Sequence, residues 1–150
     1  MDDPFREDDE VLKHVIGSLL ENRHSVIQSI LDELDGRGYE LDEFHDRLIL
    51  DEAITNAIVH GNAEDPARSV DVRLFCREDC WGVEIADEGE GFDWEALKAR
   101  LESSEINVGS SGRGFALILA CGAQLHILNG GNRVVIVREV CPDENPAEGA

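Results

Sequence analysis

The first third of the chain carries apolar residues at helical spacing. After a short stretch over residues 11–16 that fits a β-strand, a helix is expected to begin at Asn22 or Ser25 and to end at Gly36-Arg-Gly38. A second helix is expected from about Leu41 to Val59, with His60-Gly-Asn62 at its end. The apolar stripe of the first helix consists of Val26, Ile27, Ile30, Leu31 and Leu34.

From residue 70 onward the hydrophobic period changes from helical to alternating. Residues 70–76 and 81–86 read as two strands of a hairpin. The last third predicts an apolar helix over 116–121, a strand over 124–128, a turn at 129–131 and a final strand over 133–140. The segment 93–111 holds one short helix, expected over 94–101, followed by small and polar residues.

Helices and antiparallel hairpins in this order predict an α+β fold. We expect a two-layer α/β sandwich, with the helices on one face of a mixed, mostly antiparallel sheet. Strict βαβ alternation is absent, as are GxGxxG and GxxxxGK[ST], which argues against a doubly wound dinucleotide-binding fold. Residues 1–9 and 142–150 are polar and acidic, so we expect disordered tails around a folded unit spanning 10–141.

The composition describes one acidic globular domain. The chain has 150 residues, of which 42% are hydrophobic, and its 13 basic and 33 acidic side chains give a formal charge of -20. This charge repels nucleic-acid backbones and anionic membranes, so neither is an expected partner. A bound polyphosphate would need magnesium, backbone N–H groups or placed cations. Because the sequence has no long apolar run and its first residues are acidic, we expect a cytoplasmic protein.

The four cysteines show no spacing typical of a metal site. They stand at positions 76, 80, 121 and 141, without a CxxC pair. A cross-strand bond between Cys76 and Cys80 is geometrically possible, but a reducing cytosol favours free thiols. We therefore assign them no metal or redox role.

Three polar residues stand four positions apart in the second predicted helix: Glu52, Asn56 and His60. A four-residue step nearly closes a helical turn, so all three are expected on one face. A carboxylate, a carboxamide and an imidazole together suit proton transfer and the binding of a hydrated divalent cation. Two glycine-containing segments follow, Asp87-Glu-Gly-Glu-Gly-Phe92 and Gly109-Ser-Ser-Gly-Arg-Gly-Phe115. Each motif alone is common in turns, but their order and spacing indicate a nucleotide site.

In that order the chain resembles the GHKL ATPase superfamily, which includes the ATP-binding domains of gyrase, Hsp90, histidine kinases and MutL. Glu52-xxx-Asn56 matches its N-box, Asp87-x-Gly89-x-Gly91 its G1 box, and Gly112-x-Gly114 its G2 box. The likeness covers nearly the whole folded region. It is strongest to the small anti-sigma-factor serine kinases, whose N-box typically reads EAxxNAxxHG, as residues 52–61 do here.

The resemblance implies an ATP and magnesium site. Asn56 would be a magnesium ligand, because magnesium prefers hard oxygen ligands. Asp87 would accept a hydrogen bond from the adenine amino group, and the G2 glycines would present N–H groups to the phosphates. Segment 93–111 would be the ATP lid. The implied nucleotide-binding residues are Asn56, Asp87, Gly89, Gly91, Phe92, Gly112, Arg113, Gly114 and Phe115.

Glu52 is the catalytic residue that the resemblance implies. A carboxylate near a serine hydroxyl or a water can act as general base for attack on the γ-phosphate. His60 is interpreted mainly as the end of the helix, where a partly cationic ring is favourable. Arg113 fits either a phosphate contact or an exposed helix start. Where many relatives carry Gly-Thr-Thr, this chain has Gly131-Asn-Arg133, so Asn132 is a candidate for the missing polar contact near adenine.

The resemblance therefore implies an ATP- and magnesium-dependent serine/threonine protein kinase of anti-sigma type. Its implied substrate is a STAS-domain anti-anti-sigma factor, and a sigma factor and a second copy of the chain are further implied partners. One alternative is a nucleotide-dependent protein-binding module with little or no kinase activity. Another is the detached catalytic domain of a histidine kinase, but the chain lacks a helix pair carrying a phosphoacceptor histidine.

Overall fold

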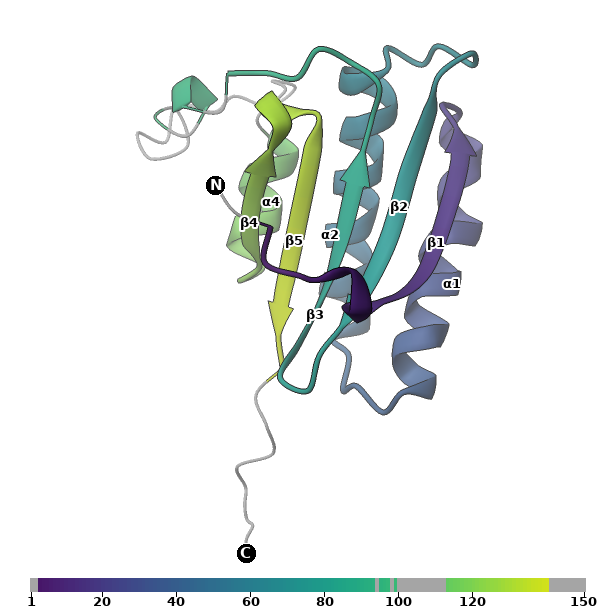
Figure 1. Cartoon of the computed structure of the whole chain (residues 1–150), viewed down its shortest axis with the longest axis vertical. Coiled ribbons are helices and arrows are strands. Elements are labelled where there is room, and N and C mark those ends of the chain that lie inside the picture. The colour runs from purple at the N-terminus through teal and green to yellow at the C-terminus, as the bar shows by residue number, and fades with distance from the viewer. Residues whose placement is uncertain (1–2, 94, 98, 100–112, 141–150) are drawn as a thin grey trace, which may run out of the picture.

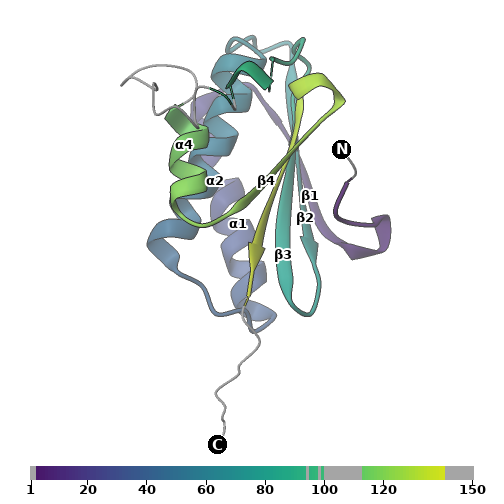
Figure 2. The same cartoon turned by 90° about the vertical axis from the view of Figure 1, so that its left-hand side faces the viewer.

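The protein forms one antiparallel sheet with its helices packed against one face (Figures 1 and 2). This computed structural model describes residues 3–93, 95–97, 99 and 113–140. The helices lie behind the sheet in Figure 1 and to its left in Figure 2. The strands are β1 (Glu10–Gly17), β2 (Ser69–Cys76), β3 (Cys80–Ala86), β4 (Gln124–Leu128) and β5 (Arg133–Glu139), and the main helices are α1 (Arg23–Gly36), α2 (Glu43–Thr55) and α4 (Arg113–Ala120).

The strand order is β1-β2-β3-β5-β4, and all pairings among these strands are antiparallel. The expected mixed sheet was wrong on this point. Two helices, α1 and α2, separate β1 from β2, so the chain enters β2 at the end of the sheet where β1 stopped. Strands β3 and β4 do run in the same direction, but β5 lies between them and pairs with both.

The main core lies between the helices and the inner face of the sheet. Every residue of the predicted apolar stripe of α1 is buried there. Alternate residues of β3 complete the layer, because side chains in a strand point to opposite faces in turn. The fully buried side chains include Trp81, Val83, Ile85, Leu34, Leu50, Ile54 and Ile118.

The outer face of the sheet carries a second, smaller core that includes the N-terminal segment. Phe5 is buried and stacks on Phe75 of β2, with ring centroids 5.2 Å apart. It fills the space above Gly82, where an added β-carbon would stand 2.2 Å from its Cε2 atom. Asp9 also forms a 3.1 Å ion pair with Arg77. The disorder expected for residues 3–9 is therefore not what the structure has, because one aromatic side chain finds an apolar site in an otherwise acidic segment.

The cysteines of the β2–β3 hairpin are free thiols, as expected. Cys76 lies opposite Trp81 in the register, so Cys80 is displaced from it by one position. Burial raises the pKa of the Cys80 thiol to about 11 and also raises the pKa of Cys76. Both thiols are thus held in the unreactive protonated form. Cys141 lies outside the described residues.

Within the described ranges, no helix combines the length and the apolar character needed to cross a bilayer.

Candidate functional site

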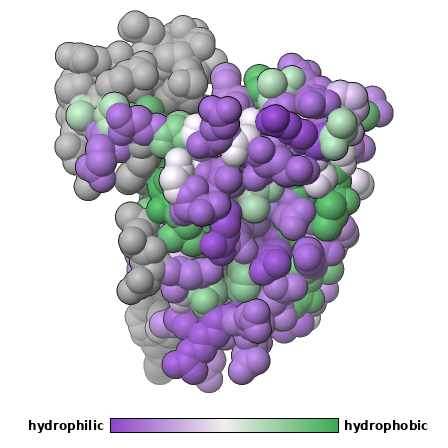
Figure 3. All heavy atoms as spheres, turned by 45° about the horizontal axis from the view of Figure 1, so that its top comes forward, coloured by the Kyte–Doolittle hydropathy of each residue, from purple (hydrophilic) through white to green (hydrophobic). Residues whose placement is uncertain are grey.

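A cavity of about 420 Å³ opens at the end of the molecule where α2 and β3 both terminate. Figure 3 turns this end toward the reader, and its surface is mostly hydrophilic with small hydrophobic patches. The walls combine apolar side chains with a few polar groups, as is typical of small-molecule sites. The lining residues are Ala53, Asn56, Ala57, His60, Gly61, Ile85, Asp87, Gly91, Phe92, Asp93, Ala96, Leu97, Phe115, Gly131 and Val134.

Helix α2 changes its hydrogen-bonding pattern where it reaches the cavity. Asp42 caps its N-terminus by accepting a bond from the backbone N–H of His45, and the helix is regular to Thr55. A wider π-helical turn then runs over Asn56–Gly61, and the N–H of Asn62 donates to the carbonyl of Ala57 at 2.9 Å. Such turns inside helices are frequent at functional sites. This turn ends the helix at the expected position and places His60, which is exposed, at the rim of the cavity.

Glu52 and Asn56 meet at one glycine of α4. A β-carbon on Gly114 would stand 2.7 Å from Nδ2 of Asn56 and 3.0 Å from Oε1 of Glu52. The backbone of the first turn of α4 therefore lies directly against these two side chains of α2, and a side chain at position 114 would not fit. The structure thus brings together two of the predicted residues, and His60 lies one wider turn away.

The carboxamide of Asn56 has an unusual environment. Its Nδ2 atom is buried and has no hydrogen-bond partner among the described residues. Buried polar atoms nearly always have a partner, so this N–H donor beside the cavity calls for an acceptor such as a water or a ligand oxygen.

Asp87 follows β3 and also lines the cavity. Its carboxylate lies against Gly61, where an added β-carbon would be 2.3 Å from Cγ. Oδ1 accepts a bond from the N–H of Gly89 at 2.8 Å, and the backbone N–H of Asp87 donates to the carbonyl of Asn132 at 2.9 Å. Burial raises the pKa of this carboxyl above its ordinary value, against the smaller lowering effects of the Gly89 bond and the Arg68 charge. Asp87 is therefore a half-buried acceptor with a fixed position.

The glycines after Asp87 permit close backbone contacts on both sides of the loop. A β-carbon on Gly89 would stand 2.1 Å from the carbonyl oxygen of Gly61. One on Gly91, whose φ is +84°, would stand 2.1 Å from the carbonyl oxygen of Gly130. Gly91 lines the cavity, whereas Gly89 packs against the end of the π-helical turn.

Two aromatic rings join this loop to α4. Phe92 and Phe115 stack with centroids 5.4 Å apart, and both line the cavity. Arg113 begins α4, but its side chain is not described. Gly112 and most of the segment expected to be the lid lie outside the described residues.

Several residues that shape the site did not stand out in the sequence. Gly61 supports the Asp87 carboxylate, and Asn62 is a fully buried polar residue that binds the same loop. Gly61 closes the N-box and Asn62 follows it directly, and the sequence at these positions indicated just a helix end. Asn132 does not line the cavity; its side chain donates to the carbonyl of Gly89 at 3.2 Å.

The described residues contain no group of three or more His, Cys, Asp or Glu side chains that could hold a metal by themselves. Magnesium in phosphoryl-transfer sites is held mainly by phosphate oxygens and water, with one or two protein ligands. A single carboxamide oxygen at Asn56, close to the start of α4, fits that mode of binding.

Comparison with known proteins gave consistent results. Residues 20–138 match the model of the histidine kinase-like ATPase domain. The anti-sigma F factor of Oceanobacillus iheyensis is 31% identical over 93 residues, which is 61% of this chain and 62% of that protein. The serine-protein kinase RsbW of Bacillus subtilis is 41% identical over 59 residues, covering 39% of this chain and 37% of that protein. The chain thus matches less than two thirds of the length of these relatives.

The fold is also found among solved structures. The mycobacterial sensor histidine kinase MprB superposes with a TM-score of 0.54 at 18% identity, covering 88% of this chain and 100% of that one. The α+β fold class expected from the sequence is confirmed, as is the resemblance to GHKL ATPases and anti-sigma kinases.

Proposed function

This chain belongs to the histidine kinase-like ATPase domain family, and from this premise we propose that it is an ATP- and magnesium-dependent serine/threonine protein kinase of anti-sigma type. The observation that carries the proposal is that one cavity has two different polar groups in its wall, a carboxylate and a carboxamide. Asp87 supplies a half-buried carboxylate at one end, and the orphaned Asn56 carboxamide lies beside Glu52 at the other.

The Asp87 end suits adenine. A carboxylate accepts a hydrogen bond from the exocyclic amino group of adenine, whereas guanine presents a carbonyl oxygen at the same position. The apolar side chains of Ile85 and Val134 and the Phe92–Phe115 pair offer flat contacts for a planar base. We therefore assign the base-binding role to Asp87, with Gly91, Phe92 and Phe115 around it.

The Asn56 end suits phosphates and magnesium. Magnesium, when bound, would neutralise phosphate charge, which the net charge of -20 of this chain otherwise opposes. Asn56 would contribute its carboxamide oxygen to the ion. Gly114 keeps the start of α4 close to that carboxamide, where the first N–H groups of the helix are available to a phosphate. Arg113 and Gly112 belong to this proposal through the family motif.

Glu52 is the proposed general base. It lies on α2 one turn before Asn56, so its carboxylate is directed to the same start of α4. It would take the proton of an incoming serine hydroxyl while the serine oxygen bonds to the γ-phosphorus, and the bond to the β–γ bridging oxygen breaks to release ADP. Asn56 and the start of α4 hold the phosphates in line for this attack.

We assign the acceptor by similarity to the relatives. A STAS-domain anti-anti-sigma factor is the proposed phosphate acceptor, and a sigma factor and a second copy of the chain are proposed binding partners. The relatives named as an anti-sigma F factor and a serine-protein kinase support this choice. The acidic charge also favours capture of a basic partner surface.

Transfer of labelled γ-phosphate to a purified STAS-domain protein tests the kinase assignment. The unmutated chain should label a serine or threonine of that protein, and Glu52→Gln should reduce the rate by at least about a hundredfold, the usual contribution of a general base. Glu43→Gln is the matched control. Glu43 is exposed in the first turn of the same helix, at the end opposite to the cavity. Undiminished transfer by Glu52→Gln would remove Glu52 from the mechanism.

The same assay separates the kinase from a nucleotide-dependent binding module. A binding module would retain the STAS-domain protein in the presence of ATP without labelling it. ATP-dependent retention with no label, at saturating magnesium, would therefore replace the kinase assignment by that alternative.

A further inference from the structure

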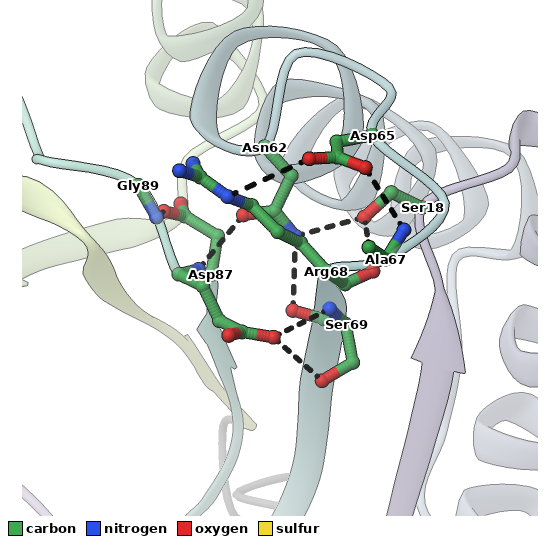
Figure 4. Close-up of polar contacts among 9 residues, drawn as sticks. Ser18, Asn62, Asp65, Ala67, Arg68, Ser69, Asp87 and Gly89 are labelled. Atoms are coloured by element: carbon green, nitrogen blue, oxygen red, sulfur yellow. Dashed lines mark hydrogen bonds and ion pairs between the residues drawn. The ribbon is translucent and has the colours of Figure 1, made fainter.

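Asn62 is a fully buried polar residue at the junction of the segments that surround the Asp87 loop (Figure 4). Its Nδ2 donates to the hydroxyl of Ser18 and to the carbonyl of Ser69, both at 2.9 Å. Its Oδ1 accepts the backbone N–H of Glu88 at 2.8 Å. One carboxamide thus joins the end of β1, the start of β2 and the loop after β3.

Glu88 is held from a second side by Ser69. Its carboxylate accepts the N–H of Ser69 at 2.6 Å and the hydroxyl of Ser69 at 3.0 Å. The backbone bond from Ser69 is the main reason why the pKa of Glu88 lies below its ordinary value. The residue next to Asp87 is therefore fixed through both its backbone and its side chain.

Asp87 itself is supported by the residue that precedes Asn62. Its carboxylate rests on Gly61, and its own N–H is bound to the carbonyl of Asn132 on the far side. Gly61 and Asn62 are consecutive, so a single short segment contacts both the Asp87 side chain and the following peptide. A movement of Asn62 would shift both contacts together.

We propose that Asn62 is a positioning residue that sets where the Asp87 carboxylate meets the nucleotide base, and thereby controls the selectivity for adenine. This inference rests on the proposed adenine-binding role of Asp87. The chemistry of the carboxamide is required, because the position needs two donated bonds and one accepted bond from the same side chain. A hydrogen bond weakens steeply once its length or angle departs from the ordinary range, so a small displacement of Asp87 costs base recognition.

Ser18 allows a positioning role of Asn62 to be distinguished from a general contribution of the network to stability. Ser18 is also fully buried, and its hydroxyl accepts a bond from Asn62 and donates to the carbonyl of Arg68 at 2.8 Å. Among the described residues, Ser18 makes no hydrogen bond to the Asp87 loop. Removing the Ser18 hydroxyl therefore perturbs the same buried network while leaving the Asn62–Glu88 bond in place.

The test compares ATP with purine riboside triphosphate, which lacks the exocyclic amino group, by calorimetry on the full chain. The unmutated protein should prefer ATP, and Asn62→Ala should weaken ATP binding by about tenfold, the loss of roughly one charge-assisted hydrogen bond. The same variant should bind the analogue almost as well as the unmutated protein does. Ser18→Ala, the matched control, should keep the preference for ATP.

A second variant covers the case in which Asn62→Ala is too unstable to measure. Glu88→Ala changes an exposed side chain and removes both bonds to Ser69, so it loosens the same loop without opening a buried cavity. It should reduce the preference for ATP by a smaller factor than Asn62→Ala.

Two results would overturn the proposal in distinguishable ways. In the first, the unmutated protein prefers ATP, but Asn62→Ala and Glu88→Ala each lose affinity for ATP and for the analogue by the same factor. Asn62 would then be a structural residue only, and the adenine role of Asp87 would stand. Equal affinity of the unmutated protein for both nucleotides would overturn the adenine role and the Asn62 proposal together.

Discussion

Arg138 of β5 forms a buried ion pair with Asp46 of α2, with Nε and Oδ1 2.7 Å apart. The two residues are 92 positions apart in the sequence. The same guanidinium donates to the carbonyl of Cys121 at 2.7 Å, just after α4 ends. One side chain therefore ties the sheet to the two helices whose other ends form the cavity.

Removing one member of this ion pair should lower the free energy of unfolding. Arg138→Ala leaves the carboxylate of Asp46, whose side chain is only 4% exposed, without its cation. We expect a loss of about 3 kcal/mol in the free energy of unfolding, typical of an uncompensated buried charge. The double variant Asp46→Asn/Arg138→Met should lose less, because no buried charge remains. Urea unfolding measures both, and equal losses for the two proteins would argue against the buried-charge explanation.

Gly114→Ala should weaken ATP binding without unfolding the protein. The new methyl group would stand 2.7 Å from Nδ2 of Asn56, so either the carboxamide or the start of α4 must move. We expect at least about a tenfold loss of ATP affinity, as for a lost hydrogen bond or ligand contact. Gly36→Ala is the matched control, because Gly36 is also helical and has nothing within 4 Å of an added β-carbon. Similar ATP affinities in both variants would contradict the tight Gly114–Asn56 contact.

Asp87→Asn should stabilise the nucleotide-free protein at neutral pH while weakening ATP binding. The folded-state pKa of Asp87 is raised by burial, so between the unfolded value and the raised value the folded state binds more protons than the unfolded state. Stability therefore falls as the pH rises through that window, and the loss persists at neutral pH. Asparagine at position 87 carries no charge, so this loss of stability does not arise, and its Oδ1 can still accept the hydrogen bond from the Gly89 N–H.

Thermal unfolding across pH checks this sign. The melting temperature of Asp87→Asn should exceed that of the unmutated protein at pH 7, and the difference should shrink as the pH falls through the raised pKa of Asp87. A difference that grows toward acid pH would show that ionised Asp87 stabilises the fold instead.

Phe5→Ala should destabilise the fold and leave the cavity unchanged. The ring contacts Phe75 and covers Gly82. The N-terminal segment that carries it lies on the face of the sheet opposite the helices (Figure 2). The Phe5 side chain is 7% exposed, so its removal should cost about 3 kcal/mol, near the lower end for buried aromatic residues. Phe44→Ala, at a position that is 72% exposed, should change stability by less than about 0.5 kcal/mol. Chemical denaturation gives the stabilities, and ATP affinity should be the same in all three proteins.

The helices and strands were predictable from the sequence because each gives a repeating pattern of apolar residues among its neighbours. The strand over 124–128 was placed at its observed bounds, and the helix stripe from Val26 to Leu34 is buried as expected. Glu52, Asn56 and Asp87 were identified because the motifs lie in an order that few folds share. Each of these signals is contained in a short stretch of sequence.

The contacts that shape the site were not predictable in the same way. No local pattern in the sequence marks the π-helical turn after Thr55, and the residue that follows this turn, Asn62, is bonded to Ser18 and to Ser69 of β2. Gly61 is required by the Asp87 carboxylate, which comes 26 residues later by number but lies directly against it. Asn62 read as a polar residue at a helix end, whereas it is fully buried.

The sequence by itself determined the order of helices and strands, the family likeness and the candidate polar residues Glu52, Asn56 and Asp87, because hydrophobic period and motif spacing are properties of neighbouring residues. Only the tertiary structure decided that every strand pairing is antiparallel, that Phe5 joins the fold, and that Glu52 and Asn56 meet at Gly114. These outcomes depend on which surfaces bury one another across large sequence separations. Packing of the whole chain, and not any local preference, sets those contacts.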